Sequence, residues 1–241
     1  MEKKKKFYCK SSDGNITYTT DGNFIYAEVG SDSMKLGLFD GHYYKLKIYK
    51  KVPILEVDGV RMHLIKDFDS PLDYSREVVK ELNIPSKGEH SILDTCMGLG
   101  YTAIAAAKKK YVKSVITCEI SEAVINLAQW NPLGELLFKD NKIVIMRGSA
   151  AELITTFSAS TFSFIIHDPP RFSHAPELYS TEFYKELFRV CKKGARIFHY
   201  VGSVGKKKGR NIEKEVEKRL LEVGFKSIKY SKRLQGLFAS K

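Results

Sequence analysis

No long uninterrupted run of apolar side chains occurs in these 241 residues. A membrane-spanning helix needs about 18 to 20 consecutive apolar residues, and the basic stretch MEKKKKF is not followed by the apolar core of a signal peptide. Internal repeats and low-complexity segments are missing as well. We therefore expect a cytoplasmic globular protein, long enough for one full-sized domain and a smaller one.

Sequence patterns typical of metal centres and disulfide frameworks are also missing. No two of the four cysteines have the short spacing of zinc ligands. The histidines near predicted strand ends, His167, His174 and His199, lack the i, i+4 spacing of a metal pair, and each is interpreted as a core or surface histidine. No metal is expected, and reduced thiols are expected at Cys9, Cys96, Cys118 and Cys191.

Positive charge is concentrated at the two ends of the chain. Residues 1–66 hold 12 Lys and Arg against 8 Asp and Glu, residues 67–200 hold 16 of each, and residues 201–241 hold 12 against 4. A neutral centre with basic flanks suits a polyanion such as RNA, held around a site that handles a neutral base. The alternative is a generally basic surface that keeps the protein soluble.

The first 66 residues have the pattern of a small all-β domain. Asp-Gly dipeptides, which favour two-residue hairpin turns, begin at Asp13, Asp21, Asp40 and Asp58. The segments between them are rich in β-branched and aromatic residues, so five or six short strands are predicted. Tyrosines and lysines of residues 43–51 suit single-stranded nucleic acid, or form the outward face of an ordinary sheet.

From residue 67 onward the pattern is that of an α/β domain. A helix is predicted after Ser70 or Asp73, either of which can cap it, and Asp73 and Arg76 are candidates for positions beside the site. Strands and helices then alternate, which predicts a doubly wound parallel sheet. The segments GFKSIKY and RLQGLFAS close the chain as a predicted antiparallel pair.

The stretch SILDTCMGLG, residues 91–100, predicts a nucleotide-type binding loop. Asp94 ends a short apolar run, and Gly98 and Gly100 leave little side-chain bulk before a helix that begins at Tyr101. Backbone amides of such a loop approach a ligand closely. The next predicted strand ends in Glu119, 19 residues beyond Gly100, where a carboxylate can bind ribose hydroxyls. A nicotinamide site is not excluded by the glycine loop alone.

The Asp94-to-Gly100 motif, combined with Glu119, resembles the class I S-adenosylmethionine-dependent methyltransferases. The resemblance implies a Rossmann-like seven-stranded methyltransferase sheet over residues 67–241 and S-adenosyl-L-methionine as cofactor. In that family an acid often contacts the adenine amino group; Ser149 has this place here, while Ile120 is expected to cover one face of adenine. The implied cofactor-binding residues are Asp94, Thr95, Gly98, Gly100, Tyr101, Thr102, Glu119, Ile120, Ser149 and Ala150.

A second informative stretch, HDPPRF, lies where the predicted strand TFSFIIHD, residues 161–168, ends. A carboxylate and a rigid backbone carbonyl can each accept one N–H of a conjugated amine and so help it to become nucleophilic. The stretch resembles the D/N/S-P-P-aromatic motif of methyltransferases that act on exocyclic base amines, which implies catalytic roles for Asp168, Pro169, Pro170 and Phe172. It departs from the motif at Arg171, a candidate substrate contact, which displaces the aromatic residue by one position.

A basic, glycine-flanked loop provides further candidate contacts to RNA phosphates. These are Lys206, Lys207, Lys208 and Arg210. The chain is similar to a group of predicted archaeal methyltransferases that are distantly spermidine-synthase-like, and four stretches carry this resemblance: DTCMGLGYTA, HDPPRF, the helix ELYSTEFYKELFRV and the strand FHYVG.

That resemblance implies N-methylation of a base amine in rRNA or tRNA. Cytidine N4 of ribosomal RNA is the first expectation, and guanosine N2 of tRNA is the second. Two alternatives remain: aminopropyl transfer to a polyamine, which requires several acids to hold a polycation, and a non-catalytic RNA-binding or assembly protein.

Overall fold

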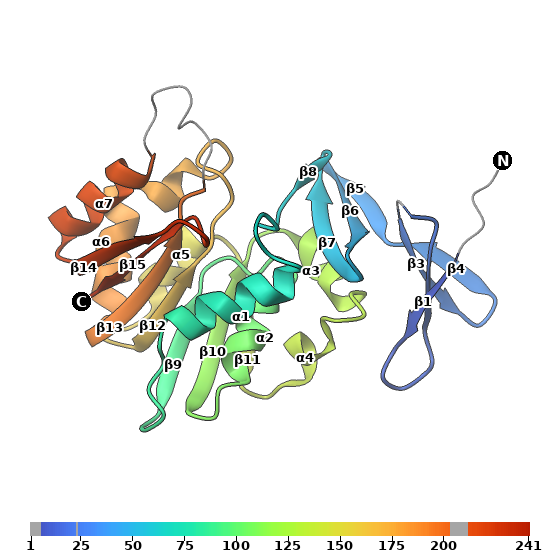
Figure 1. Cartoon of the computed structure of the whole chain (residues 1–241), viewed down its shortest axis with the longest axis horizontal. Helices are drawn as coiled ribbons and strands as arrows, with labels where there is room; N and C mark the ends of the chain where they lie inside the picture. The colour runs from blue at the N-terminus through green and yellow to red at the C-terminus, as the bar shows by residue number, and fades with distance from the viewer. Residues whose placement is uncertain (1–5, 23, 203–211) are drawn as a thin grey trace.

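The computed structural model describes residues 6–22, 24–202 and 212–241. Within these ranges the N-terminal part forms two four-stranded antiparallel sheets (Figure 1). The first contains β1 (Lys6–Lys10), β2 (Thr17–Thr20), β3 (Ile25–Val29) and β4 (Asp32–Lys35); the second contains β5 (Gly37–Asp40), β6 (His42–Tyr49), β7 (Val52–Val57) and β8 (Val60–Arg61). The predicted antiparallel β region is confirmed, but five or six strands was too few, because β4 and β5 are separated only by Leu36.

The Asp-Gly dipeptides form turns, as predicted. Gly14, Gly22, Gly41 and Gly59 all have positive φ, between 69° and 91°, the backbone region that glycine enters without steric cost. At the β7–β8 turn Asp58 also has a positive φ of 47°, as a type I′ turn requires. The turns therefore set the strand boundaries in this part of the chain.

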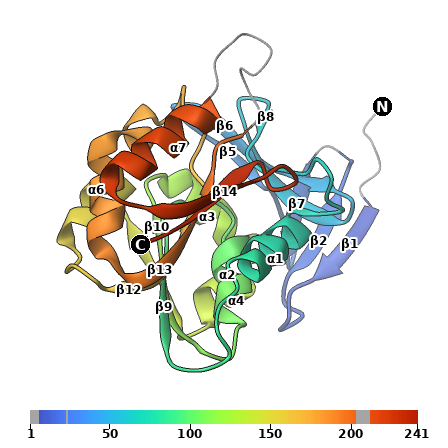
Figure 2. The same ribbon diagram turned by 60° about the vertical axis from the view of Figure 1, so that its left-hand side comes forward.

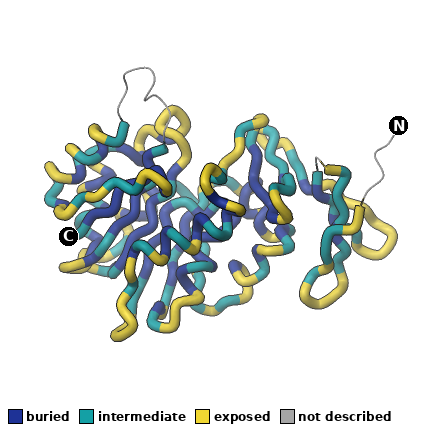
Figure 3. Tube along the Cα trace, in the orientation of Figure 1, coloured by how far each residue is buried: buried dark blue, intermediate teal, exposed yellow. Residues whose placement is uncertain are grey.

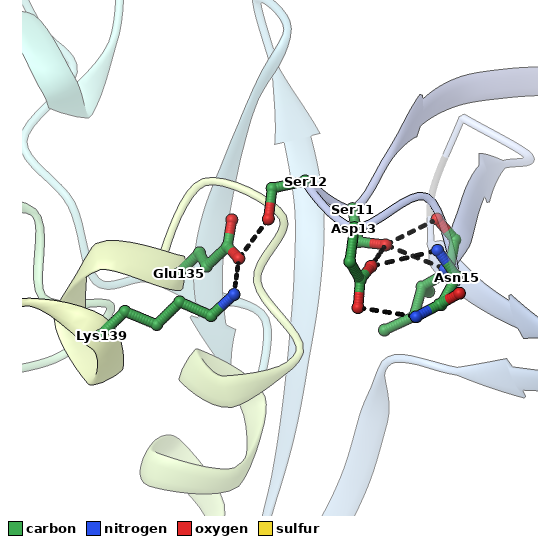
Figure 4. A network of polar contacts seen from close by, with 7 residues as sticks. Ser11, Ser12, Asp13, Asn15, Glu135 and Lys139 are labelled. Atoms are coloured by element: carbon green, nitrogen blue, oxygen red, sulfur yellow. Dashed lines mark hydrogen bonds and ion pairs between the residues drawn. The ribbon is translucent and has the colours of Figure 1, made fainter.

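The first sheet projects away from the rest of the molecule, and only Tyr18, Ile25 and Ala27 of its strand residues are buried (Figure 3). The loop between β1 and β2 nevertheless contacts the body through helix α4 (Glu135–Lys139): Ser12 donates a hydrogen bond to Glu135, which also pairs with Lys139 (Figure 4). Asp13 holds the loop in shape by accepting hydrogen bonds from the Ser11 hydroxyl at 2.6 Å and the Asn15 amide at 3.1 Å.

The central sheet has seven strands within the described residues, in the order β11-β10-β9-β12-β13-β15-β14 (Figure 1), and Figure 2 gives a second view of it. Five neighbouring strands run parallel, and β15 is antiparallel to both β13 and β14. The predicted mixed α/β fold is thus confirmed. The strands are β9 (His90–Asp94), β10 (Val112–Glu119), β11 (Ile143–Arg147), β12 (Phe162–His167), β13 (Cys191–Tyr200), β14 (Lys226–Ser231) and β15 (Gly236–Ser240).

Helices cover both faces of this sheet. Of the two candidate caps of the first helix, Ser70 is the one used, because its hydroxyl oxygen accepts from the Asp73 amide at 3.2 Å. The helices are α1 (Pro71–Glu81), α2 (Tyr101–Ala107), α3 (Glu122–Gln129), α4, α5 (Ala150–Leu153), α6 (Thr181–Val190) and α7 (Ile212–Val223), with the short 3₁₀ segments η1 (Ile154–Thr156) and η2 (Pro176–Tyr179). None of them is long and apolar enough to cross a membrane.

Alternate side chains of the sheet enter two hydrophobic cores, as the period of two in a strand requires. Ile92 and Ile166 pack with α1, α2 and α3, whereas their neighbours Leu93 and Ile165 pack with α5, α6 and α7. The first of these cores continues without interruption into Leu46 and other residues of the N-terminal sheets. Thus the N-terminal sheets share a hydrophobic core with the face of the central sheet that α1, α2 and α3 cover.

Candidate functional site

The carboxyl ends of neighbouring strands bring the predicted acids to one edge of the sheet. Asp94 ends β9, Glu119 ends β10, and Asp168 directly follows β12. In a doubly wound sheet this edge is where ligands bind. The two motifs, whose acids Asp94 and Asp168 lie 74 positions apart in the chain, therefore belong to one candidate site.

Asp94 is fully buried yet keeps one oxygen unpaired. Its Oδ2 accepts hydrogen bonds from Thr102 Oγ1 at 3.1 Å and Thr117 Oγ1 at 2.9 Å. Its Oδ1 has no hydrogen-bond partner among the described residues. Burial raises the pKa of Asp94 to about 7. A buried acceptor without a partner is costly, so this oxygen is suited to a hydrogen-bond donor on a ligand.

Two glycines shape the loop that follows, for different reasons. Both have positive φ, 53° at Gly98 and 75° at Gly100. A Cβ at Gly98 would meet no described atom within 4 Å, whereas a Cβ at Gly100 would lie 2.5 Å from Leu137. Gly98 thus leaves open space at the loop, and Gly100 allows α2 to approach α4.

Glu119 holds this loop from the adjacent strand. Its Oε2 accepts from the Gly98 amide at 3.0 Å, and its Oε1 accepts from the Ser121 amide at 3.0 Å. Burial raises the pKa of Glu119, while these amide hydrogen bonds lower it. A carboxylate oxygen can accept more than one hydrogen bond, so the predicted ribose contact is compatible with this arrangement.

The residues expected around adenine follow β10 and β11 and differ in exposure. Ile120 is 73% exposed, although it is a large apolar side chain. Ser149 precedes α5 without using its hydroxyl as a helix cap, and Ala150 is buried. Their contacts to a cofactor stay predictions.

Three other predicted cofactor contacts have hydroxyls that are bonded within the protein. Thr102 donates to Asp94, and Thr95 donates to His167 Nδ1 at 2.6 Å. Tyr101 donates to the Pro53 carbonyl at 2.9 Å and accepts from Asn131 at 3.1 Å. These hydroxyls therefore shape and support the loop, and the contacts of the three residues to a cofactor stay predictions.

Asp168, the acid of the second motif, is hydrogen-bonded to a residue that the sequence analysis did not select. The Tyr74 hydroxyl on α1 donates to Asp168 Oδ2 at 3.1 Å. Burial raises the pKa of Asp168 to about 7, an effect that the Tyr74 hydrogen bond partly offsets. Burial and the nearby carboxylate hold the pKa of Tyr74 well above its usual value, so Tyr74 stays protonated and remains a donor. The sequence analysis placed Asp73 and Arg76 of this helix beside the site, and that position was the only sequence signal that could have indicated a role for Tyr74.

The two prolines and the following aromatic residue form a supported turn. Pro169 is buried, and the Pro170 carbonyl accepts a hydrogen bond from Tyr179 Oη at 2.8 Å. Phe172 is 41% exposed, and its ring packs edge-on against Tyr179 with 5.6 Å between centroids. Arg171 is exposed. This turn presents one aromatic face to the surface beside Asp168.

A cavity of about 590 Å³ lies next to Tyr74, whose ring packs edge-on against Phe68. Asp73 accepts from Arg76 at 2.9 Å, and Lys50 pairs with Asp69 at 3.1 Å. Four acids and three cations line the cavity: Asp67, Asp69, Asp73 and Glu77 with Lys50, Arg76 and Arg233. Asp73 and Arg76 are thus paired with each other in the lining of this cavity, and their predicted position beside the site stays a prediction.

Lys206, Lys207, Lys208 and Arg210 lie outside the described residues. In the part of the chain that the structure describes, no three His, Cys, Asp or Glu side chains lie close enough together to hold a metal ion. The four cysteines are free thiols.

The doubly wound sheet, the glycine loop after β9 and the carboxylates at three strand ends define a Rossmann-like α/β enzyme. Residues 41–231 match the family model described as the spermine/spermidine synthase domain. The chain belongs to this family.

Comparison with individual proteins finds one similar sequence, and solved structures of a spermidine synthase and of a methyltransferase with a similar fold. An uncharacterized protein of Methanocaldococcus jannaschii is 40% identical over 248 residues, which cover all of this chain and 83% of that protein. Spermidine synthase from Thermotoga maritima has a TM-score of 0.70 at 18% identity, covering all of this chain and 82% of that chain. A methyltransferase from Archaeoglobus fulgidus, described as SAM-dependent, has a TM-score of 0.53 at 11% identity, covering 73% of this chain and 97% of that chain. The structural likenesses show a shared fold.

Proposed function

We propose that this protein is an S-adenosylmethionine-dependent methyltransferase that modifies an exocyclic amine of an RNA base, with cytidine N4 of ribosomal RNA as the preferred target. One observation carries the proposal: Asp168 is a half-buried carboxylate, hydrogen-bonded to Tyr74 and followed by two prolines, at the ligand-binding edge of the sheet. This is the arrangement that an sp² amine needs in order to become a nucleophile.

The cofactor loop fits an adenosyl group that carries a methionine tail. Asp94 keeps a buried oxygen for a donor such as an ammonium, and the open space beside Gly98 accommodates a ligand against the loop. Glu119 is placed to accept from ribose hydroxyls. When bound, S-adenosylmethionine supplies an electrophilic methyl group on its sulfonium.

Asp168 and the Pro169 carbonyl are the proposed acceptors of the two N–H groups of the target amine. Holding both hydrogens orients the nitrogen lone pair toward the cofactor side of the site. As the new N–C bond forms and the C–S bond breaks, the nitrogen loses one proton. Asp168, with its pKa raised to about 7, is suited to receive that proton and release it to solvent.

The target base must leave its helix to reach a half-buried carboxylate at the end of a strand. Phe172 offers a partly exposed ring on which such a base can stack. The excess of lysine and arginine in residues 1–66 and 201–241 supports a polyanionic substrate around this neutral centre. These features favour RNA over a small cationic acceptor.

Aminopropyl transfer is the second candidate, favoured by the family match and by the cavity beside Tyr74. Its four acids are the kind of lining that a polyamine requires. However, Arg76, Lys50 and Arg233 lie within 4 Å of acids in the same lining. Those pairs reduce the negative charge available to a polycation, so RNA methylation remains the preferred proposal.

The test is a transfer assay with both cofactors. The purified protein is incubated with labelled S-adenosylmethionine, or with its decarboxylated form, in the presence of ribosomal subunits, tRNA or a polyamine mixture, and the products are analysed by mass spectrometry. Methyl label on a cytidine amine, lost in Asp168→Ala, supports the proposal. Label on a polyamine from the decarboxylated cofactor alone would replace it with the second candidate.

A further inference from the structure

A buried hydrogen bond joins the two strands that carry Asp94 and Asp168. Asp94 and Ile166 are paired in register across β9 and β12, and the Thr95 amide continues the ladder to the Ile166 carbonyl at 3.0 Å. One residue further on, Thr95 Oγ1 lies 2.6 Å from His167 Nδ1, and both residues are at most 2% exposed. The contact thus lies directly after one candidate carboxylate and directly before the other.

The neighbours of His167 fix its tautomer. Its Nε2 lies 2.9 Å from the Leu178 carbonyl, which can only accept, so Nε2 carries the hydrogen. Nδ1 therefore accepts from the Thr95 hydroxyl. Burial lowers the pKa of His167 to about 3, which keeps the ring neutral. Because both nitrogens are occupied, this ring has none free to take a proton from a substrate.

Leu178 lies one residue before the end of the segment that forms the proposed acceptor side of the site. We name residues 169–179 the acceptor strap. Tyr179 Oη donates to the Pro170 carbonyl, and the Tyr179 carbonyl accepts from Arg219 at 2.6 Å. The Tyr179–Pro170 hydrogen bond therefore joins the two ends of the strap to each other, and Leu178 and Tyr179 tie it to His167 and Arg219, with the Phe172 ring packed on Tyr179.

A second buried histidine limits the movement of the first. The ring of His199 lies 4.3 Å from that of His167, at 63°. Its Nε2 accepts from Tyr184 Oη at 2.7 Å, and its Nδ1 donates to the Tyr200 carbonyl at 2.8 Å. An aliphatic side chain at position 167 could fill the same volume but would leave the Thr95 hydroxyl and the Leu178 carbonyl unpaired, at about 1 to 3 kcal/mol each.

We propose that His167 is a positioning residue which, through Thr95 and Leu178, holds the acceptor strap and Asp168 at a fixed separation from the cofactor loop. The proposal rests on the transfer reaction proposed above. His167 touches no reacting atom in this scheme. Its effect is on geometry, and misplacing reacting groups by about 1 Å can cost roughly 100-fold in rate.

Removal of the Thr95 hydroxyl at nearly constant volume tests the proposal. Thr95→Val is expected to lower kcat by about 10- to 100-fold, with the acceptor KM and the cofactor Kd changed by less than about threefold. Thr95→Ser, which restores the hydroxyl, is expected to recover most of the lost rate. His42→Gln, at an exposed histidine on β6, is the matched control. A Thr95→Val enzyme with the wild-type kcat would overturn the proposal.

A second readout needs no acceptor. Nitrogen NMR of the histidine rings is expected to show His167 protonated on Nε2 alone from pH 5 to 8, and Thr95→Val is expected to shift the ring resonances of Phe172 and Tyr179. If the wild-type protein transfers no group to any amine, the proposed function fails. These spectra still show whether the Thr95–His167 hydrogen bond positions the acceptor strap. Unchanged Phe172 and Tyr179 resonances in Thr95→Val would overturn it.

Discussion

The Tyr74 hydroxyl donates a hydrogen bond to Asp168 across 94 positions of the chain, at 3.1 Å. It links α1, which leads into the cofactor domain, to the turn that follows β12. The Ser70 cap fixes where α1 begins, and the start of the helix decides which of its residues face the sheet. The cap therefore determines that Tyr74 is the residue that donates to Asp168. The chemistry of the acceptor carboxylate thus depends on a helix start far away in sequence.

Tyr74→Phe is expected to slow methyl transfer by about 10-fold, close to the worth of one hydrogen bond to a charged group. The substitution keeps the ring that packs against Phe68 and Phe198. Without the hydroxyl the pKa of Asp168 rises, so the loss should be larger at pH 6.5 than at pH 8.5. Steady-state kinetics at the two pH values measure this effect. An equal loss at both would contradict the assigned role.

Activity is expected to rise with pH through a transition near pH 7. Burial raises the pKa of Asp168 to about 7, and only the ionised carboxylate can accept both an amine N–H and the departing proton. The profile of kcat/KM should therefore fall on the acid side. Asp94 has a similarly raised pKa, so Tyr74→Phe is used to decide which acid causes the transition. If Asp168 causes it, the midpoint of the profile moves to higher pH in this variant; an unchanged midpoint would indicate another group.

Glu119→Gln is expected to weaken cofactor binding by at least about 10-fold, or about 1.4 kcal/mol. A carboxamide can accept with only one of its two terminal atoms, so either the Gly98 or the Ser121 amide loses its partner. Calorimetric titration with S-adenosylmethionine measures the change. Glu122→Gln, at an exposed neighbour that pairs with Arg147, is the control. Equal affinity of the Glu119→Gln variant and the wild type would exclude Glu119 from the cofactor site.

Alanine at the two loop glycines should produce different defects. Both substitutions strain a positive φ, at a cost of about 1 kcal/mol. Gly100→Ala also places a methyl group against Leu137, so it should lower the melting temperature further, and Leu137→Ala should partly reverse that loss. Gly98→Ala meets no protein atom and should chiefly raise the cofactor Kd. Thermal melts and titrations of both variants separate the two effects.

Asp94→Asn is expected to gain stability relative to the wild type as the pH rises. The folded-state pKa of Asp94 is raised to about 7, so its contribution to stability is full below the unfolded pKa near 3.9 and is lost as pH rises through 7. Between pH 4.5 and 8 the difference in unfolding free energy should move by about 3 kcal/mol in favour of the variant. Urea melts at both pH values check this, and a difference independent of pH would refute it.

The strand ends and the acids on them could be predicted from sequence because each depends on local pattern. Asp94, Glu119 and Asp168 each follow an apolar run, and parallel strands bring such positions to a common edge. The cap at Ser70 and the Asp-Gly turns are local too, and both are found in the structure.

Contacts between distant segments could not be predicted in the same way. Nothing local indicates that the Tyr101 hydroxyl binds the Pro53 carbonyl, 48 positions away, or that Tyr74 meets Asp168. The predicted helix ELYSTEFYKELFRV, residues 177–190, was wrong at its start, because residues 176–179 form a 3₁₀ turn tied to His167 and the α-helix begins after the Ser180 cap. Tertiary hydrogen bonds decided that boundary.

The hydrogen bond between Thr95 and His167 also has a consequence for sequence evolution in this family. A change at either position alone strands a buried polar group, whereas a joint change to apolar residues removes donor and acceptor together. Intermediates with one change are thus disfavoured. Relatives should divide into those with a hydroxyl and an imidazole at these positions and those with neither, so the two alignment columns are expected to covary.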